Sequence, residues 1–201
     1  MRAARPHRLL ATALLTLGLL AAPGLAAAGA GGRLPLQEPP RPRRQAVVSL
    51  EDFHAALDPL GTWFVHPRWG QVWKPTGVSN LWRPYTRGRW ARTDGTWYWV
   101  SEEPWAWATY HFGRWFLDPL TGWLWAPGKR WAPAWVQWRE GKGIAGWAPL
   151  GPDGKALAMH YTFVPAGKLE EPADEVALPA PRTGEALRDT RPVGAQAQAS
   201  R

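Results

Sequence analysis

The feature that most constrains the fold of this chain is an internal repeat of tryptophan-rich segments. The stretch GTWFVHPRWGQVWKP at 61–75 aligns without a gap with GRWFLDPLTGWLWAP at 113–127, and two glycines and the final proline match. The matched tryptophans are Trp63 with Trp115 and Trp73 with Trp125. Self-similarity of this kind indicates that one small structural unit is built more than once.

All sixteen tryptophans lie between Trp63 and Trp147, and the residues around them are typical of β-hairpins. Asp94-Gly95 is a strong two-residue turn signal, and 118–122 suits a type I turn followed by a left-handed glycine. Because side chains alternate between the two faces of a strand, these turns set tryptophans opposite one another. The expected core pairs are Trp63 with Trp73, Trp90 with Trp99, Trp115 with Trp125, and Trp138 with Trp147. Burying one such ring stabilises a fold by about 4–6 kcal/mol, so we expect these pairs to form the core.

The predicted fold is all-β, with about eight short antiparallel strands arranged as four hairpin repeats. The pairing pattern leaves open whether the strands close into a barrel or form a twisted sheet. One short helix precedes them, because Ser49 and Asp52 form a capping box and Pro59 and Gly61 end the helical pattern.

The chain divides into four segments. Residues 1–30 have the pattern of a secretory signal peptide, with early arginines, an apolar run and small residues at the end, and no membrane-spanning segment is expected after its cleavage. A Pro/Arg-rich linker is predicted at 31–46, the tryptophan-rich domain at 47–165 and a disordered tail at 166–201. The signal peptide holds three of the 24 basic residues, so 21 remain against 16 acidic ones, a net charge of +5. The basic tails predict a weak affinity for anionic polymers.

Three longer stretches carry a family resemblance: LWRPYTRGRW at 81–90, WVSEEPWAWATYHFGRW at 99–115 and GWLWAPGKRWAPAWVQWREGKGIAGWAPL at 122–150. They resemble the tryptophan-rich bacterial exported-protein family catalogued as domain of unknown function 6600, whose members are often labelled proline-rich exported proteins. The resemblance runs from about Glu51 to Pro152. It implies a β domain with flexible flanks, exported to the periplasm or exterior of a Gram-negative-type bacterium. It supplies no activity, because the family has no assigned catalytic or binding residues to carry over. The chain departs from the family pattern at Ala91 and Leu117, two positions where other members of the family often have an aromatic residue.

Catalytic chemistry finds little support in the sequence. There is no cysteine and no H-x-x-x-H spacing, and four histidines of the predicted domain lie on separate segments, so neither a metal nor a cofactor is expected. Phosphate-cradling and G-x-S-x-G motifs are absent. A glycosidase-like pair of acids, Glu102-Glu103 with Asp94 or Asp118, is a remote alternative, but both aspartates already have turn-forming roles. We therefore expect a protein that is not an enzyme.

Eight tryptophans remain outside the expected pairs, and their exposure separates two functional interpretations. In the first, exposed aromatic rings stack on a cell-wall or other polysaccharide. The candidate ligand-binding residues are Trp69, Trp105, Trp107, Trp131 and Tyr110, with Arg89, Arg114 and Glu103 as polar partners. In the second, the domain is a structural or protein-interaction scaffold of the cell envelope, and the arginines stack on neighbouring rings. Export argues against a specific nucleic-acid partner.

Overall fold

The computed structural model describes residues 48–196, which belong to one compact unit spanning Pro35–Arg201. The predicted signal peptide and the linker at 31–46 lie outside the described residues. Two hairpins come first, β1 (Gly61–His66) with β2 (Gly70–Pro75) and β3 (Arg89–Thr93) with β4 (Thr96–Val100). Two more follow, β5 (Arg114–Asp118) with β6 (Gly122–Ala126) and β7 (Val136–Gly141) with β8 (Ile144–Pro149). The four expected hairpins are therefore present.

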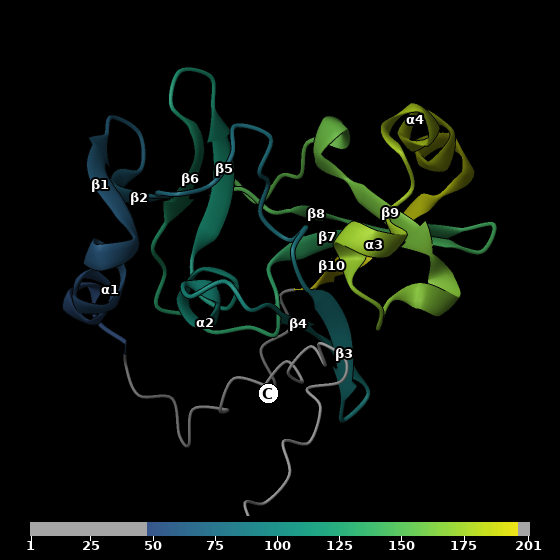
Figure 1. Cartoon of the computed structure of the whole chain (residues 1–201), viewed down its shortest axis with the longest axis horizontal. Coiled ribbons are helices and arrows are strands. Elements are labelled where there is room, and N and C mark those ends of the chain that lie inside the picture. The colour runs from purple at the N-terminus through teal and green to yellow at the C-terminus, as the bar shows by residue number, and fades with distance from the viewer. Residues whose placement is uncertain (1–47, 197–201) are drawn as a thin grey trace, which may run out of the picture. The chain divides into compact units, whose positions relative to one another are not determined.

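These strands and two later ones form three antiparallel sheets (Figure 1). The first sheet has the order β1-β2-β6-β5 and the second the order β10-β7-β8-β9, where β9 is Thr162–Pro165 and β10 is Arg191–Gln196. The third sheet contains β3 and β4 alone. The all-β prediction is confirmed, and the described strands form open sheets instead of a closed barrel.

All four predicted tryptophan pairs are confirmed by the strand register. The pairs face each other across β1–β2, β3–β4, β5–β6 and β7–β8. The turns are of the expected kind, since Asp94 and Gly95 have φ angles of 50° and 78° and Gly122 one of 88°. One further pair joins two hairpins, because Trp73 of β2 lies opposite Trp125 of β6. The two copies of the repeat thus become halves of one sheet.

The second-strand tryptophan of three hairpins lies over a glycine of the first strand. A Cβ added to Gly113 would stand 2.2 Å from the Ala126 carbonyl oxygen and 2.8 Å from Nε1 of Trp125. Gly61 and Gly88 have the same relation to Trp73 and Trp99. The repeated G-x-W motif therefore provides a space that no side chain can enter without moving the indole or the backbone.

Several of these indoles are also anchored by hydrogen bonds to the backbone. The Nε1 atom of Trp73 donates to the Leu57 carbonyl at 3.1 Å, and that of Trp125 donates to the Phe112 carbonyl at 2.8 Å. Trp147 Nε1 donates to a more distant segment, the Tyr85 carbonyl, at 2.9 Å. Each of these bonds satisfies a buried donor and ties the hairpin to the chain that leads into it or to a neighbouring connection.

Replacing Gly113 with alanine tests the glycine contact. Gly113→Ala is expected to lower the free energy of unfolding by about 3 kcal/mol, because the new methyl group overlaps the backbone of β6. Gly122→Ala is the matched control, since Gly122 also has a positive φ but nothing lies within 4 Å of the place that its new methyl group would take. The control should lose about 1 kcal/mol, from backbone strain alone. Equal losses in urea denaturation would contradict the packing explanation.

The N-terminal helix α1 (Leu50–Leu57) forms as the capping box predicts. The Ser49 side chain accepts a hydrogen bond from the Asp52 backbone N–H at 3.1 Å, and the Asp52 carboxylate accepts from the Ser49 N–H at 2.8 Å. The helix buries Phe53 and Leu57, and the Phe53 ring meets Trp125 edge-on at a centroid distance of 5.0 Å. A single-turn 3₁₀ helix, η1 (Asp58–Leu60), then leads into β1. The helix therefore covers the tryptophan face of the first sheet.

The core consists mainly of tryptophan rings packed against one another. Ten of the sixteen tryptophans are buried, five are half-buried, and Trp107 alone is exposed, at 39%. Trp90 connects two hairpins, because its ring lies within 5.5 Å of those of Trp99, Trp138 and Trp147. The expectation that the cross-strand pairs build the core is met, although Trp63 is half-buried.

The prediction of a disordered tail from residue 166 is wrong for 166–196. That segment forms η3 (Ala166–Lys168), α3 (Ala173–Val176), α4 (Ala180–Asp189) and β10, while η2 (Ala158–His160) precedes β9. The physical reason is that the segment buries small groups that carry no periodic signal, such as Ala173 and Ala186. The predicted domain boundary at 165 therefore moves to at least 196, and 197–201 lie outside the described residues.

A single arginine of β7 holds this C-terminal segment. Arg139 donates from Nη2 to the Leu187 carbonyl at 2.7 Å and to the Thr190 carbonyl at 2.5 Å, and from Nε to the Thr190 hydroxyl at 3.1 Å. The following strand β10 then pairs with β7 along its length. The sequence pattern predicts a strand around Arg139 but does not predict its hydrogen bonds to the C-terminal segment.

Removing this arginine should loosen the C-terminal segment selectively. Arg139→Ala is expected to cost about 2 kcal/mol, because hydrogen bonds from a charged donor are lost, and to speed amide exchange in β10. Hydrogen exchange read by mass spectrometry measures both the site and the size of the change. Arg182→Ala, at an exposed position, is the control and should leave exchange in β10 unchanged. Unchanged exchange over 187–196 in Arg139→Ala would contradict the role of Arg139.

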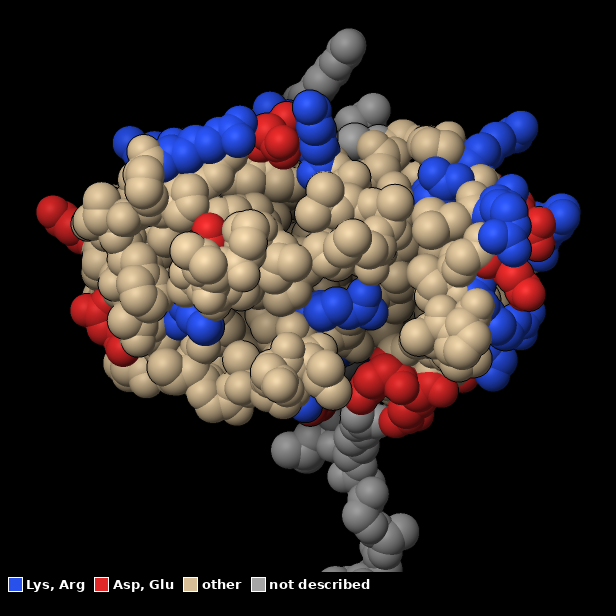
Figure 2. Space-filling model, turned by 90° about the horizontal axis from the view of Figure 1, so that it is seen from above, with Lys and Arg blue, Asp and Glu red and all other residues tan. Residues whose placement is uncertain are grey.

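Seen from above the tips of the hairpins, the surface is largely uncharged (Figure 2). Few acidic side chains lie within this face, whereas basic side chains occur both inside it and at its margins.

Candidate functional site

The eight residues predicted to bind a ligand do not form one surface. Tyr110 and Trp105 are buried in the core, with exposures of 0% and 7%, so the prediction that they stack on a ligand is wrong. Both follow β4, around the short helix α2 (Ala106–Thr109), which turns their rings inward. Trp69, Trp107 and Trp131 keep some exposure, but each contacts a different set of rings.

Glu103 and Tyr110 do come together, in a buried polar cluster. The Glu103 carboxylate accepts hydrogen bonds from Trp82 Nε1 at 2.6 Å and from the Tyr110 hydroxyl. The Tyr85 hydroxyl donates to the Tyr110 carbonyl at 2.8 Å. Burial raises the pKa of Glu103, although the bonds from Tyr110 and Trp82 oppose it. The spacing W-x-x-Y occurs twice in the sequence, at Trp82–Tyr85 and at Trp107–Tyr110. Because both Glu103 carboxylate oxygens accept hydrogen bonds, this cluster joins the two copies.

The two predicted arginines have different surroundings. Arg114 places its guanidinium 3.2 Å from the ring centroid of Trp135 and donates to the Gly113 carbonyl at 2.8 Å. Burial lowers the pKa of Arg114 to about 10. This is the cation–π packing that the scaffold interpretation expects. Arg89 begins β3, opposite Val100, and is half-buried.

Trp131 covers a buried histidine. The His111 ring stacks with Trp131 at 5.8 Å and lies 4.7 Å from Tyr98, and its Nδ1 is 3.1 Å from the Ala132 carbonyl oxygen. Burial lowers the pKa of His111 to about 4, so the ring is neutral at physiological pH. The cluster therefore has no exposed base and is a packing feature.

The depressed pKa of His111 predicts the pH dependence of stability. The unfolded chain binds a proton at this ring near pH 6.5, but the folded chain binds it only near pH 4. Protons therefore favour unfolding in this window, and the free energy of unfolding should fall as the pH drops from about 6.5 to about 4. In His111→Gln this contribution disappears. The free energies of unfolding of the unchanged chain and of the variant, measured by denaturation at each pH, should therefore approach each other as the pH falls. Parallel curves would contradict the assignment.

The best candidate for a binding site lies on the opposite face of the first sheet from the tryptophan pairs. Three aromatic rings are available there: Phe64 of β1, Phe116 of β5 and Trp69 of the first turn, here called the outer shelf. Phe64 is 39% exposed, and the other two are half-buried. Trp69 and Phe116 rest on a buried aliphatic row formed by Val72, Leu124 and Ala126, and their ring centroids are 6.1 Å apart.

Polar groups surround the outer shelf. The Arg68 guanidinium lies over the Trp69 ring at 4.4 Å. His66 Nδ1 accepts backbone N–H groups of Arg68 and Trp69, and His66 Nε2 lies 3.6 Å from an Asp118 oxygen. Hydrogen bonds from the turn, chiefly from Thr121, lower the pKa of Asp118. With Nδ1 occupied, His66 can donate from Nε2 but is not a free base, so the shelf can bind without catalysing proton transfer.

Sequence reasoning identified Trp69 but missed Phe64 and Phe116. The signal was present in the repeat itself, because Phe64 aligns with Phe116 and His66 aligns with Asp118. The alternation that places the tryptophans inside also places these four residues on the other face. The pairing rule used for the tryptophans therefore predicts a second, outward-facing row of residues in the same two hairpins.

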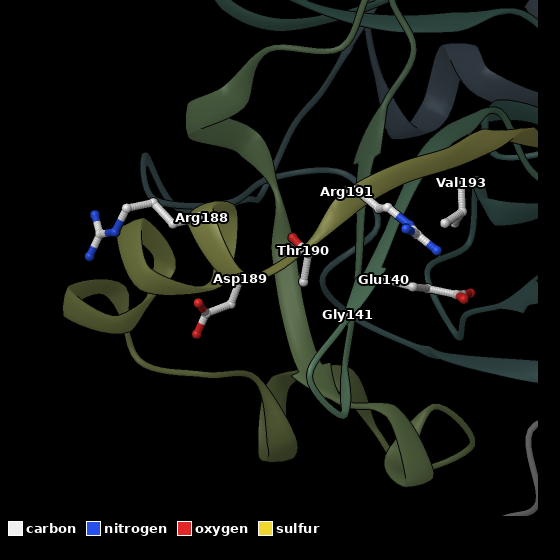
Figure 3. A pocket seen from close by; sticks show the side chains of 7 residues that line it. All are labelled: Glu140, Gly141, Arg188, Asp189, Thr190, Arg191 and Val193. Carbon is white, nitrogen blue, oxygen red and sulfur yellow. The ribbon is translucent and has the colours of Figure 1, made fainter.

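One surface groove is present near the C-terminal segment (Figure 3). Its lining contains Glu140 and Gly141 of β7 together with Arg188, Asp189, Thr190, Arg191 and Val193. In Figure 3 the side chains of Glu140 and Arg191 extend in the same direction, whereas those of Arg188 and Asp189 lie on the other side of the groove. Asp189 is engaged by Lys142 at 2.6 Å. The groove is the seam where β10 meets β7, with no constellation of reactive groups.

Two searches of residues 48–196 bear on other kinds of site. Within that range no group of three or more His, Cys, Asp or Glu side chains is placed to hold a metal ion. Over the same residues, no helix combines the length and apolar character needed to cross a bilayer.

Comparison with known proteins gives a family match for the hairpin region. A family model described as "Family of unknown function (DUF6600)" matches residues 54–154, which include the four tryptophan-paired hairpins. No curated protein and no solved structure matches the chain. The matched range stops before β9 and the C-terminal elements.

Proposed function

On the premise that the chain belongs to this family of unknown function, we propose that it is an exported, non-catalytic module that binds a polysaccharide of the cell envelope on the outer shelf. The observation that carries the proposal is the placement of Phe64, Trp69 and Phe116 at the surface of a domain that buries most of its large rings. Export rests on the signal-peptide pattern at 1–30.

The geometry of the outer shelf suits a sugar chain. Flat aromatic faces stack on the apolar faces of sugar rings, and a few polar groups at the rim orient the hydroxyl groups. Arg68, His66 and Lys74 line that rim as donors, although Lys74 also donates to the Thr121 carbonyl at 2.6 Å. Because the shelf is built on paired strands over a buried aliphatic row, a ligand would meet a preorganised surface.

The acidic groups support binding over catalysis. A glycosidase needs two carboxyl groups on opposite sides of a sugar, one of them free to donate a proton. Glu103 is saturated by Trp82 and Tyr110, and Asp118 accepts two backbone N–H groups of its own turn. Neither side chain is free for an acid or base role.

A pair of tryptophan substitutions tests the outer shelf. Trp69→Ala should weaken binding of oligosaccharides or soluble peptidoglycan fragments about tenfold in isothermal titration calorimetry, because one stacking face is lost. Trp107→Ala is the matched control: this ring is also exposed, but it packs beside Phe53 of α1, away from the shelf. Its affinity should equal that of the unchanged chain.

Two results would overturn the proposal. One is the absence of heat with any glycan at millimolar concentration. The other is an equal loss of affinity in Trp69→Ala and Trp107→Ala, because this would show that the shelf has no special role.

A second candidate function is a structural scaffold of the envelope. It is favoured by the buried indoles of Trp125 and Trp147, whose N–H groups donate to backbone carbonyls of other segments, and by the stacking of Arg114 on Trp135. In that case the chain would bind no glycan, and the outer shelf would contact another protein.

A further inference from the structure

A second surface feature adjoins the outer shelf at the β1–β2 turn. The five most exposed large hydrophobic side chains of the described residues are Leu120 at 97%, Leu81 at 84%, Val65 at 80%, Met159 at 73% and Leu157 at 51%. With the partly exposed Leu117, they are here called the tip face. Exposed aliphatic residues are common singly, but a cluster of the most exposed ones on one face marks an interaction surface.

Contacts between their elements place these residues on one face. The tips of β1–β2 and β5–β6 meet through His66 and Asp118 at 3.6 Å. Trp123, which lies opposite Leu117, packs against His160 of η2 at 4.7 Å. Figure 1 shows both hairpin tips and η2 on the same side of the fold, and the β3–β4 turn on the other.

The connection that carries Leu81 joins the same face. Figure 1 shows the connection between β2 and β3, which contains Leu81, on the same side of the fold as the two hairpin tips. Leu81 itself points outward, because its neighbour Trp82 is buried against Trp115 at 5.3 Å. Four separate turns and connections therefore each present aliphatic side chains to solvent.

The charges around the tip face are mainly basic. Arg68 follows Val65, Arg83 follows Leu81, and Lys155 precedes Leu157. The nearby acids Asp118 and Asp153 are each held by backbone N–H groups of their own turns. Figure 2, which looks onto this side, shows a largely uncharged surface with few acidic side chains inside it. Protruding aliphatic side chains with basic side chains among them complement the surface of an anionic bilayer.

We propose that the tip face docks on a lipid bilayer that carries anionic phospholipid headgroups. Leu120, Val65 and Met159 enter the boundary between headgroups and acyl chains, while Arg68, Arg83 and Lys155 remain at the level of the phosphates. Separate protruding points fit a deformable bilayer better than a rigid partner, which would need a continuous complementary surface.

The absence of native cysteine allows a direct test. A chain that begins at Pro35 is used, because Pro35–Arg201 is a compact unit and the apolar run at 9–20 would bind membranes by itself. An environment-sensitive dye is attached to Leu120→Cys or, as control, to Thr96→Cys, which is exposed beside the β3–β4 turn on the other side. Vesicles contain phosphatidylcholine alone or with one third phosphatidylglycerol.

The expected result is a blue shift of the dye at position 120, and none at 96, with the vesicles that contain phosphatidylglycerol. The double variant Val65→Asp with Leu120→Asp should reduce vesicle binding at least about tenfold, since two apolar contacts are replaced by charges that the headgroups repel. Both positions are exposed, so circular dichroism should show an unchanged fold.

Three outcomes would overturn the docking proposal. They are no binding to the anionic vesicles, binding without a blue shift at position 120, and a blue shift caused by soluble glycan instead of vesicles. Phe64→Ala separates this proposal from the one above, because Phe64 belongs to the outer shelf and not to the tip face. This variant should bind vesicles normally even though its affinity for glycan falls.

Discussion

The contact between a second-strand indole and a first-strand glycine is the constraint on which the rest of the structure depends. In three hairpins a tryptophan lies so close to a glycine that an added Cβ would come within 2.9 Å of the indole and 2.3 Å of a carbonyl oxygen. This close approach lets two large rings share one face of a narrow hairpin. The fourth hairpin has Val136 where the others have glycine, and its Trp147 is anchored instead by the Tyr85 carbonyl.

Packing so many rings inside has a consequence for the outside of the molecule. The hairpins are short, and residues next to a buried tryptophan point to the opposite face. Phe64 and Phe116 are therefore brought to the outer shelf by the same alternation that turns Trp63 and Trp115 toward the core. Val65 and Leu117, one position further on, reach the hairpin tips beyond the end of the core. The repeat thus creates both candidate binding surfaces. They use different aromatic and aliphatic residues of the same two hairpins and share Arg68 of the first turn.

The polar groups of the interior are held by hydrogen bonds and ring contacts within the fold. Glu103 is the most suggestive acidic group in the sequence, yet its carboxylate is occupied by Trp82 and Tyr110. His111 is neutral and covered by Trp131 and Tyr98. Each of these groups satisfies buried donors or fills space between connections. The sequence placed the candidate binding residues in the connections between hairpins, where the unpaired tryptophans lie. In the structure the candidate binding surfaces lie instead on the outer face and at the tips of the first sheet.

The amino-acid sequence by itself determined the hairpins, their register and the four tryptophan pairs. Turn chemistry and period-two alternation act over a few residues, so Asp94-Gly95 and Gly122 are sufficient to set Trp90 opposite Trp99 and Trp115 opposite Trp125. Only the tertiary structure decided which hairpins join, which unpaired rings are buried, and that 166–196 fold. Those outcomes depend on contacts between distant segments, such as Trp73 with Trp125 and Arg139 with Thr190, and no local pattern records which surface a connection will meet.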